Sequence, residues 1–254
     1  MKSRELKARE SQSKESQSRE LKSRIAIVAA LEREVRPLTR GWRREAAPDG
    51  VTVYSSEKAV VAFAGMGVDR AGAAAAAALS FGPAHRLISV GWAGALHSGI
   101  RCGGVWRVGT VIDPTNGEIY DTADAGERLS HTAVLVTTDH VISAREKKHL
   151  HDRLSADLVD MEALAVARVA RARGIPFQAV KAVSDEYDFD LPGMEQFATP
   201  EGRFREAGFA LYVALRPALW GRVARMARHS STAAANLCAE LEQYLAWEEQ
   251  RVRA

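Results

Sequence analysis

The strongest constraint on the fold is the alternation of continuous apolar runs with helical patterns. The apolar runs have the length and composition of buried central strands, and they lie at Arg24–Ala30, Ala59–Ala64, Leu87–Gly91, Gly109–Asp113, Thr132–Val136 and Phe177–Ser184. Helical patterns separate several of them, at Glu32–Arg40, Arg70–Phe81, Ser143–Leu154 and Met161–Arg173. Strands that alternate with helices without a long linker predict one three-layer α/β domain.

The C-terminal part of the chain has a different pattern. Gly174-Ile175-Pro176 ends the last helix of the alternating part, with Gly past the helix end and Pro preventing its continuation. From Phe204 to Leu245 the pattern is mostly helical and is broken at Arg216-Pro217. We therefore expect a single domain over residues 25–254, with a C-terminal helical extension over about 204–250.

The net charge of +3 belongs to the N-terminus. Of the 35 basic and 32 acidic side chains, residues 1–24 hold eight and four, which leaves 27 and 28 on the other 230 residues. This segment repeats Ser-Arg-Glu-Leu-Lys and has no large apolar face. We expect a disordered or frayed low-complexity tail; the alternative is a nucleic-acid or membrane-binding arm, which the alternation of Glu with the basic residues disfavours.

Several classes of protein are excluded by what the sequence contains. No run approaches the roughly 18 apolar residues of a membrane span, and the polar N-terminus has no signal-peptide core, so we expect a cytoplasmic protein. Cys102 and Cys238 are far apart and outside any C-x-x-C motif, which argues against a disulfide scaffold and a structural zinc site. No H-E-x-x-H motif is present, and we expect no bound metal.

A glycine turn, Gly65-Met66-Gly67, follows an apolar run and precedes a helix. It is not a dinucleotide fingerprint, because Arg70 stands where the third glycine is needed and no acidic residue ends the next strand. The turn can still bring backbone N–H groups to a polar ligand at a helix N-terminus. The alternative is a turn selected for backbone geometry alone.

Acidic side chains follow the strands at three places. They are Glu32 and Glu34 after the first strand, Asp160-Met161-Glu162 at a helix start, and Ser184-Asp185 after the last strand. Ligands of open α/β sheets bind outside the carboxyl ends of the strands, so these side chains could meet in one site. Each alone could equally be a helix cap or a partner of the helix dipole.

Six segments in this order resemble the nucleoside phosphorylase and nucleosidase superfamily, especially its methylthioadenosine/S-adenosylhomocysteine nucleosidase branch. They are IAIVAALEREV (25–35), FAGMGVDRAGAA (63–74), SVGWAGAL (89–96), VTTDHVI (136–142), DLVDMEALAVARVA (157–170) and GIPFQAVKAVSD (174–185). The resemblance implies a three-layer α/β/α fold around a twisted mixed sheet. It also implies a small-molecule nucleoside substrate, no metal or organic cofactor, and a homodimer or other homo-oligomer.

The resemblance also implies roles for individual residues. Asp185 matches the general acid that protonates or hydrogen-bonds the purine N7, and Ser184 would orient it. Glu162 matches the carboxylate that accepts hydrogen bonds from the ribose hydroxyls, and Met161 the apolar contact with the sugar. Glu34 matches the residue that positions and activates the attacking water.

Further substrate-binding positions depart from the family pattern. By the same resemblance they are Gly67, Trp92, Ala93, Gly94, Val141, Ile142 and Lys181. Trp92 replaces a small hydroxyl residue, Val141 stands where an aromatic residue usually stacks on the base, and Lys181 replaces Arg. The base site is then expected to be apolar without stacking, and the charge of Lys181 is kept without the planar geometry of Arg.

The segment Phe204–Arg228 mixes aromatic and aliphatic residues with five Arg and one Glu. It fits helices that cover the sheet or an oligomer surface, and alternatively an amphipathic pair that makes a peripheral membrane contact. Together with Trp92 and Asp190-Leu191-Pro192, it resembles the hopanoid-associated branch, whose substrate, adenosylhopane, has a large apolar 5′ substituent. We therefore expect hydrolytic cleavage of such an adenine nucleoside; the alternatives are a phosphorolytic nucleoside phosphorylase and a catalytically silent nucleoside-binding module.

Overall fold

The strands of the protein form one mixed sheet. The computed structural model describes residues 24–123, 132–190, 193, 195–197, 199 and 205–253. Within these residues the strands are β1 (Arg24–Ala29), β2 (Arg43–Ala46), β3 (Thr52–Ser55), β4 (Ala59–Phe63), β5 (Ala84–Ala95), β6 (Val105–Ile112), β7 (Ile119–Asp121), β8 (Thr132–Thr137), β9 (Leu158–Asp160) and β10 (Phe177–Asp185). The predicted tail lies outside the described residues, except for Arg24, which begins β1.

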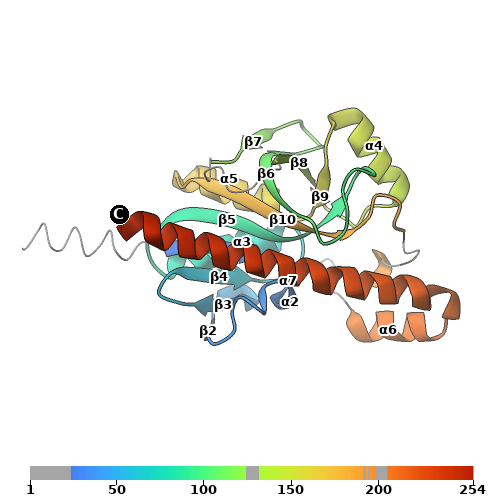
Figure 1. Cartoon of the computed structure of the whole chain (residues 1–254), viewed down its shortest axis with the longest axis horizontal. Helices are drawn as coiled ribbons and strands as arrows, with labels where there is room; N and C mark the ends of the chain where they lie inside the picture. Colours follow the sequence, from blue (N-terminus) through green and yellow to red (C-terminus); the bar gives the residue numbers. More distant parts are fainter. Residues whose placement is uncertain are drawn as a thin grey trace, which may run out of the picture.

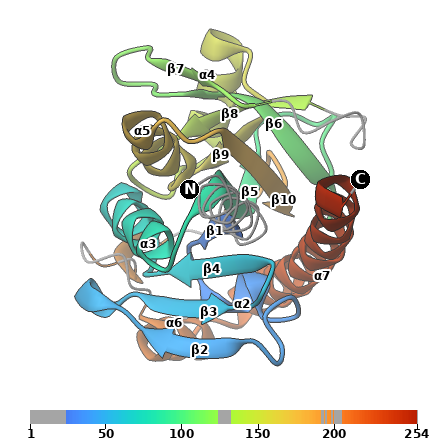
Figure 2. The ribbon, with the colours of Figure 1, turned by 90° about the vertical axis from the view of Figure 1, so that its left-hand side faces the viewer.

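Six α-helices are described. They are α2 (Glu32–Val35), α3 (Val68–Ser80), α4 (Ala144–Leu154), α5 (Ala163–Arg173), α6 (Glu206–Ala214) and α7 (Pro217–Arg253), and there are two short 3-10 turns, η1 (Pro48–Gly50) and η2 (Glu195–Phe197). Helices α3 and α5 cover one face of the sheet and α7 covers the other (Figures 1 and 2). This is the expected arrangement of helices on both faces of a central sheet.

The centre of the sheet is built of parallel strands. Its order is β10-β6-β8-β9-β5-β1-β4-β3-β2, with β7 beside β6, and β10 also pairs with β5. The strands β4, β1, β5 and β10 are parallel neighbours. Their carboxyl ends therefore lie at one edge of the sheet. Because β10 pairs with β5 on one side and with β6 on the other, the part of the sheet from β6 to β9 curves back toward β5.

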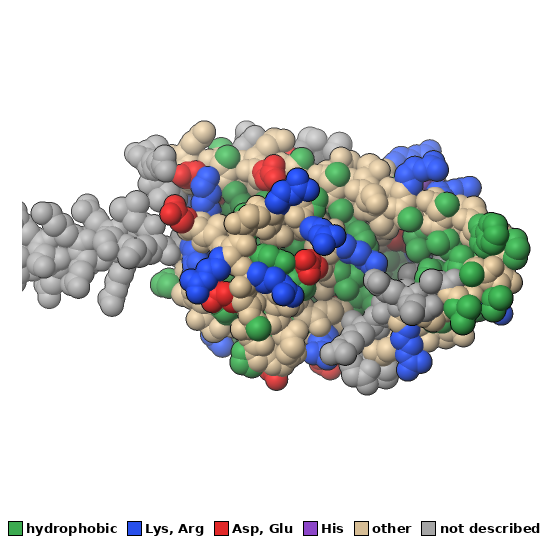
Figure 3. Space-filling model, turned by 90° about the horizontal axis from the view of Figure 1, so that it is seen from below, with side chains coloured by type: hydrophobic (Ala, Val, Ile, Leu, Met, Phe, Trp, Pro, Cys, Tyr) green, Lys and Arg blue, Asp and Glu red, His purple; other side chains and the backbone are tan. Residues whose placement is uncertain are grey.

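The C-terminal extension consists of the short helix α6 and the long helix α7. Helix α7 runs along the whole body, and α6 with the first turns of α7 lies at one end of the molecule (Figure 1). Hydrophobic side chains gather on this end (Figure 3), where Leu211, Leu215 and Trp220 are exposed. No helix among the described residues is both long enough and apolar enough to span a membrane.

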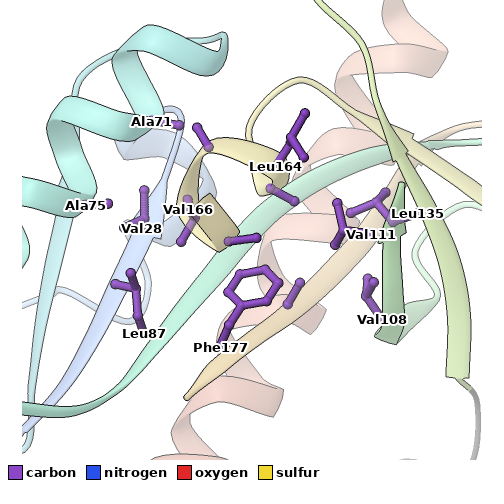
Figure 4. Packing of buried hydrophobic residues seen from close by; sticks show 14 of the residues in the cluster. Val28, Ala71, Ala75, Leu87, Val108, Val111, Leu135, Leu164, Val166 and Phe177 are labelled. Carbon is purple, nitrogen blue, oxygen red and sulfur yellow. The ribbon is translucent and has the colours of Figure 1, made fainter. Parts of the chain in front are cut away.

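Small side chains let the helices approach the sheet. In the cluster between the sheet and α3 and α5, Ala71 and Ala75 lie beside Val28 and Leu87, with Val166 next to them (Figure 4). A second cluster fills the space between the sheet and α7. Both faces of the central strands are therefore buried, which explains their continuous apolar runs.

The predicted elements agree with the structure except at their ends and in short strands. All six apolar runs form strands, namely β1, β4, β5, β6, β8 and β10, and the helical extension breaks at Arg216-Pro217 as predicted. The predicted helix Glu32–Arg40 is wrong beyond Val35, because Pro37 has no backbone N–H to continue the hydrogen bonds of the helix. The sequence did not reveal β2, β3, β7 and β9, which have only three or four residues each.

Candidate functional site

The carboxyl ends of the parallel strands carry the predicted acidic residues. Glu34 follows β1, Gly67 follows β4, and Asp185 ends β10. Glu162 follows β9, which pairs with the end of β5. The structure therefore collects side chains from distant parts of the chain at one edge of the sheet, as the strand order requires.

Glu34 is a buried carboxylate held by the backbone. Its side chain is 3% exposed, and Oε2 accepts hydrogen bonds from the backbone N–H groups of Ala30 (3.1 Å) and Leu31 (3.2 Å). Burial raises the pKa of Glu34, and the Leu31 N–H and the charge of Lys181 offset part of that rise. A buried carboxylate with a raised pKa is a stronger base toward water than an exposed one.

A glycine makes room for this carboxylate. A Cβ added at Gly91 would lie 3.0 Å from Oε2 of Glu34, and the glycine has φ +140°. Both the space and the backbone conformation therefore select glycine at this position of β5.

Glu162 is buried near Glu34, and its side chain does not cap the helix α5 that follows it. Asp160 caps α5 instead, because its Oδ2 accepts the backbone N–H of Ala163 (2.9 Å). The Glu162 carboxylate accepts the N–H of Gly67 at Oε1 (2.9 Å) and that of its neighbour Met161 at Oε2 (3.2 Å). Burial and then the charge of Asp160 raise the pKa of Glu162 to about 7; Lys181 opposes the rise, and Glu34 adds to it.

Lys181 is buried beneath these carboxylates. Its Nζ lies 2.8 Å from Oδ2 of Asp160 and 3.0 Å from Oγ of Ser89, and its side chain has no exposed surface. The predicted contact of Lys181 with substrate stays a prediction, and in this structure the side chain is buried and paired with Asp160. Its ammonium balances the charge of Asp160 and acts electrostatically on Glu34 and Glu162.

Asp185 has partners on both carboxylate oxygens. The hydroxyl of Ser184 donates to Oδ1 (2.8 Å), and Nζ of Lys147 forms an ion pair with Oδ2. Gly94 lies against the pair, since a Cβ there would be 2.8 Å from Oδ2 of Asp185 and 3.3 Å from Nζ of Lys147. The Ser184 hydroxyl therefore holds one oxygen of Asp185, and the Ala93 carbonyl is a more distant alternative acceptor for the same proton (3.4 Å).

The two acidic groups are spaced along β5. Glu34 lies against Gly91 and Asp185 lies against Gly94. Three residues of extended strand span about 10 Å. The two carboxylates therefore lie at different positions along the same strand.

The surroundings of three other predicted residues are as follows. Trp92 packs against the cluster between the sheet and α7, and the Arg33 guanidinium lies 5.0 Å from its ring centroid. Val141 and Ile142 are half-buried in the loop before α4, and Ile142 packs against the cluster under that helix. Their predicted contacts with the substrate stay predictions.

The sequence reasoning missed Lys147 and the role of Asp160. Lys147 stands in a strongly charged helix, Arg145 to Arg153, where a lysine is normally solvated. The available signal was its place three residues before Leu150, on the buried side of α4.

A cavity between the sheet and α7, lined by residues that include Ile88 and Tyr244, contains none of the predicted site residues.

The comparisons with known proteins agree with this fold. The family model described as the phosphorylase superfamily matches residues 113–216. That range contains Glu162 and Asp185 but not Glu34. A comparison with curated protein sequences gives no significant match.

Solved nucleosidase structures superpose on most of the chain. The Helicobacter pylori 5′-methylthioadenosine/S-adenosylhomocysteine nucleosidase has a TM-score of 0.67 and 17% identity, covering 89% of this chain and 98% of its own. Futalosine hydrolase of Helicobacter pylori has a TM-score of 0.65 and 18% identity, with coverages of 89% and 98%. The Arabidopsis thaliana 5′-methylthioadenosine nucleosidase has a TM-score of 0.67 and 18% identity, with coverages of 89% and 95%. The chain therefore has the fold of these nucleosidases.

Proposed function

We propose that this chain is a purine nucleosidase that uses water to cleave the N-glycosidic bond of an adenine nucleoside. The observation that carries the proposal is the pair of buried carboxyl groups with raised pKa, Glu34 and Glu162, at the same edge of the sheet as Asp185. The nucleosidase fold and the phosphorylase superfamily match support the same reaction class. The fold alone would be compatible with other functions.

Each acidic group meets one requirement of the reaction. As the C1′–N9 bond breaks, its electron pair goes to the base and positive charge develops on the sugar. Asp185 would deliver a proton to the base, and Glu162 would accept hydrogen bonds from the sugar hydroxyls. Glu34 would take a proton from the water that adds to C1′.

Water suits this site better than phosphate. Among the described residues, the buried cations next to the acidic groups are Lys147 and Lys181, and both are paired with aspartates. A phosphate bound near Glu34 would be repelled by its carboxylate, and the buried cations beside it, Lys147 and Lys181, already balance aspartates. The proposal therefore favours hydrolysis over phosphorolysis.

A panel of nucleosides, incubated with and without phosphate, tests this function. We expect release of adenine and free sugar at rates that do not depend on phosphate. Formation of sugar 1-phosphate would instead make the chain a phosphorylase. Binding of adenine in calorimetry, with no base released from any nucleoside over hours, would replace the enzyme with a silent binding module.

The proposed substrate class has an apolar 5′ substituent, as in adenosylhopane. The exposed apolar side chains of α6 and of the first turns of α7 favour this substrate class, because they offer a surface for a large apolar group. The ring centroids of Phe197 and Phe209 (5.4 Å apart) and of Phe197 and Tyr212 (5.2 Å apart) lie at the same end of the molecule. In the same panel, adenosylhopane should have a higher kcat/KM than methylthioadenosine. Equal or faster turnover of methylthioadenosine would contradict this choice of substrate.

We also propose that this end contacts a membrane surface. Leu211, Leu215 and Trp220 are exposed. The same segment of the chain carries the exposed arginines Arg205, Arg216, Arg222, Arg225 and Arg228. Apolar side chains within a basic surface fit the boundary between acyl chains and anionic headgroups. The alternative occupant is a second copy of the chain, as in the expected homo-oligomer.

Sedimentation of the full chain with phosphatidylglycerol vesicles and with phosphatidylcholine vesicles distinguishes the two. We expect binding to the anionic vesicles that weakens with salt and falls at least tenfold in Leu215→Glu. Ile119→Glu, at an exposed apolar residue of β7, is the matched control and should bind like the wild type. Wild-type protein that binds neither vesicle at low salt would contradict the membrane contact, and dissociation of an oligomer by Leu215→Glu alone would assign the surface to a second copy.

A further inference from the structure

Lys147 is a buried cation whose ammonium is committed to Asp185. Its side chain is 3% exposed. Nζ donates to Oδ2 of Asp185 and to the backbone carbonyl of Glu186 (2.8 Å). A buried lysine is rarely tolerated unless it is paired, so this contact requires an explanation.

The helix that carries Lys147 is fixed at its start. The hydroxyl of Ser143 accepts the N–H of Glu146, and the carboxylate of Glu146 accepts the N–H of Ser143, which is a reciprocal cap. His140 adds a contact to Glu146 (3.1 Å). Lys147 is the next residue, so its position relative to the end of β10 is well determined.

A carboxyl paired with an ammonium is a poor proton donor by itself. The ion pair keeps its proton on nitrogen, whereas the departing base needs one from the carboxyl. We propose that Lys147 is the positioning residue of Asp185 and stores the proton that Asp185 passes to the base. This inference rests on the proposed nucleosidase function.

The proton balance of such a step is complete. The C1′–N9 electron pair moves to the base. Asp185 takes a proton from the Lys147 ammonium and passes it to the base, so that Asp185 ends as a carboxylate and Lys147 as an amine. Water adds to C1′ and gives its proton to Glu34. Solvent then carries a proton from Glu34 to Lys147, which restores the enzyme.

Other groups near the pair do not replace this role. Cys102 lies close enough to interact with it, but burial and then the charges of Glu186 and Asp185 raise its pKa to about 12, so it stays a thiol at neutral pH. The Glu186 side chain is 4.0 Å from Arg101, which is exposed. Among the described residues, Lys147 is the cation in contact with the Asp185 carboxylate.

The test measures kcat and KM against pH for Lys147→Met and Lys147→Arg. In Lys147→Met, kcat should fall about 100-fold near pH 7.5, and the alkaline limb of kcat/KM should move at least two pH units lower, because the stored proton is gone. Lys147→Arg should keep KM but remain at least tenfold low in kcat, since a guanidinium does not release its proton. Lys148→Met removes the neighbouring exposed lysine, which pairs with Asp152, and should act like the wild type.

Two results would overturn the proposal. They are a Lys147→Met enzyme with an unchanged pH profile and a Lys147→Arg enzyme with full kcat. If Lys147→Met does not fold, nuclear magnetic resonance of ¹⁵N-labelled lysine in the wild type and in Asp185→Asn decides. The ¹⁵N resonance of the Lys147 ammonium should move in Asp185→Asn, because its charge partner is lost; an unchanged resonance would overturn the pairing. A wild type that cleaves no nucleoside would disprove the proposed function, and the resonance result would still judge the pair.

Discussion

Asp185→Asn is expected to reduce base release by at least 10³-fold. An amide cannot pass a proton to the departing base, and proton transfer by a positioned group contributes typically 10²–10⁴-fold. Loss of the charge that pairs with Lys147 should add to the effect. The rate of adenine release at saturating nucleoside, measured in the wild type and the variant, checks this prediction.

Stability must be measured beside activity in the same variant. The amide would leave the ammonium of Lys147 without its charge partner, so the melting temperature should fall while the far-ultraviolet circular dichroism stays native. Asp188→Asn, three residues further and exposed, is the matched control and should keep full activity. Adenine release by Asp185→Asn at more than a tenth of the wild-type rate would remove Asp185 from the reaction.

The fold could be predicted well from the sequence because its central strands are buried on both faces. Continuous runs such as Arg24–Ala30 and Phe177–Ser184 have few interpretations other than central strands. The short strands β2, β7 and β9 carry no such signal, since three or four residues can be placed in a sheet by their neighbours alone. The early end of α2 could have been predicted from Pro37.

The candidate site was predictable only where strand ends position it. Glu34, Glu162 and Asp185 each lie at or just after a strand end, so the rule for open sheets brings them to one edge. Lys147 comes from a strongly charged helix, and its burial depends on how α4 packs on the cluster that contains Val136 and Val159. For Lys181, the sequence shows the charge but does not identify the partner, which in the structure is Asp160.

Glu162→Gln is expected to lower activity and raise stability at the same time. The variant keeps an oxygen that can accept the N–H of Gly67, but it loses the charge that would bind the sugar hydroxyls. We expect kcat/KM to fall about 100-fold, which corresponds to about 2.7 kcal/mol of transition-state stabilisation. Initial rates over a range of nucleoside concentrations measure this loss.

The gain in stability should depend on pH. Burial and the charge of Asp160 raise the pKa of Glu162 to about 7 from 4.5, so the folded protein binds more protons than the unfolded chain between these two pH values. The free energy of unfolding of the wild type therefore falls as pH rises through this window. Glu162→Gln lacks that dependence, so its advantage should be small at pH 4.5 and approach at most about 3 kcal/mol at pH 8. Urea unfolding of both proteins at both pH values measures this difference in the free energy of unfolding. An equal difference at pH 4.5 and pH 8 would contradict the prediction. It would mean that burial of the charged Glu162 carboxylate does not destabilise the folded protein.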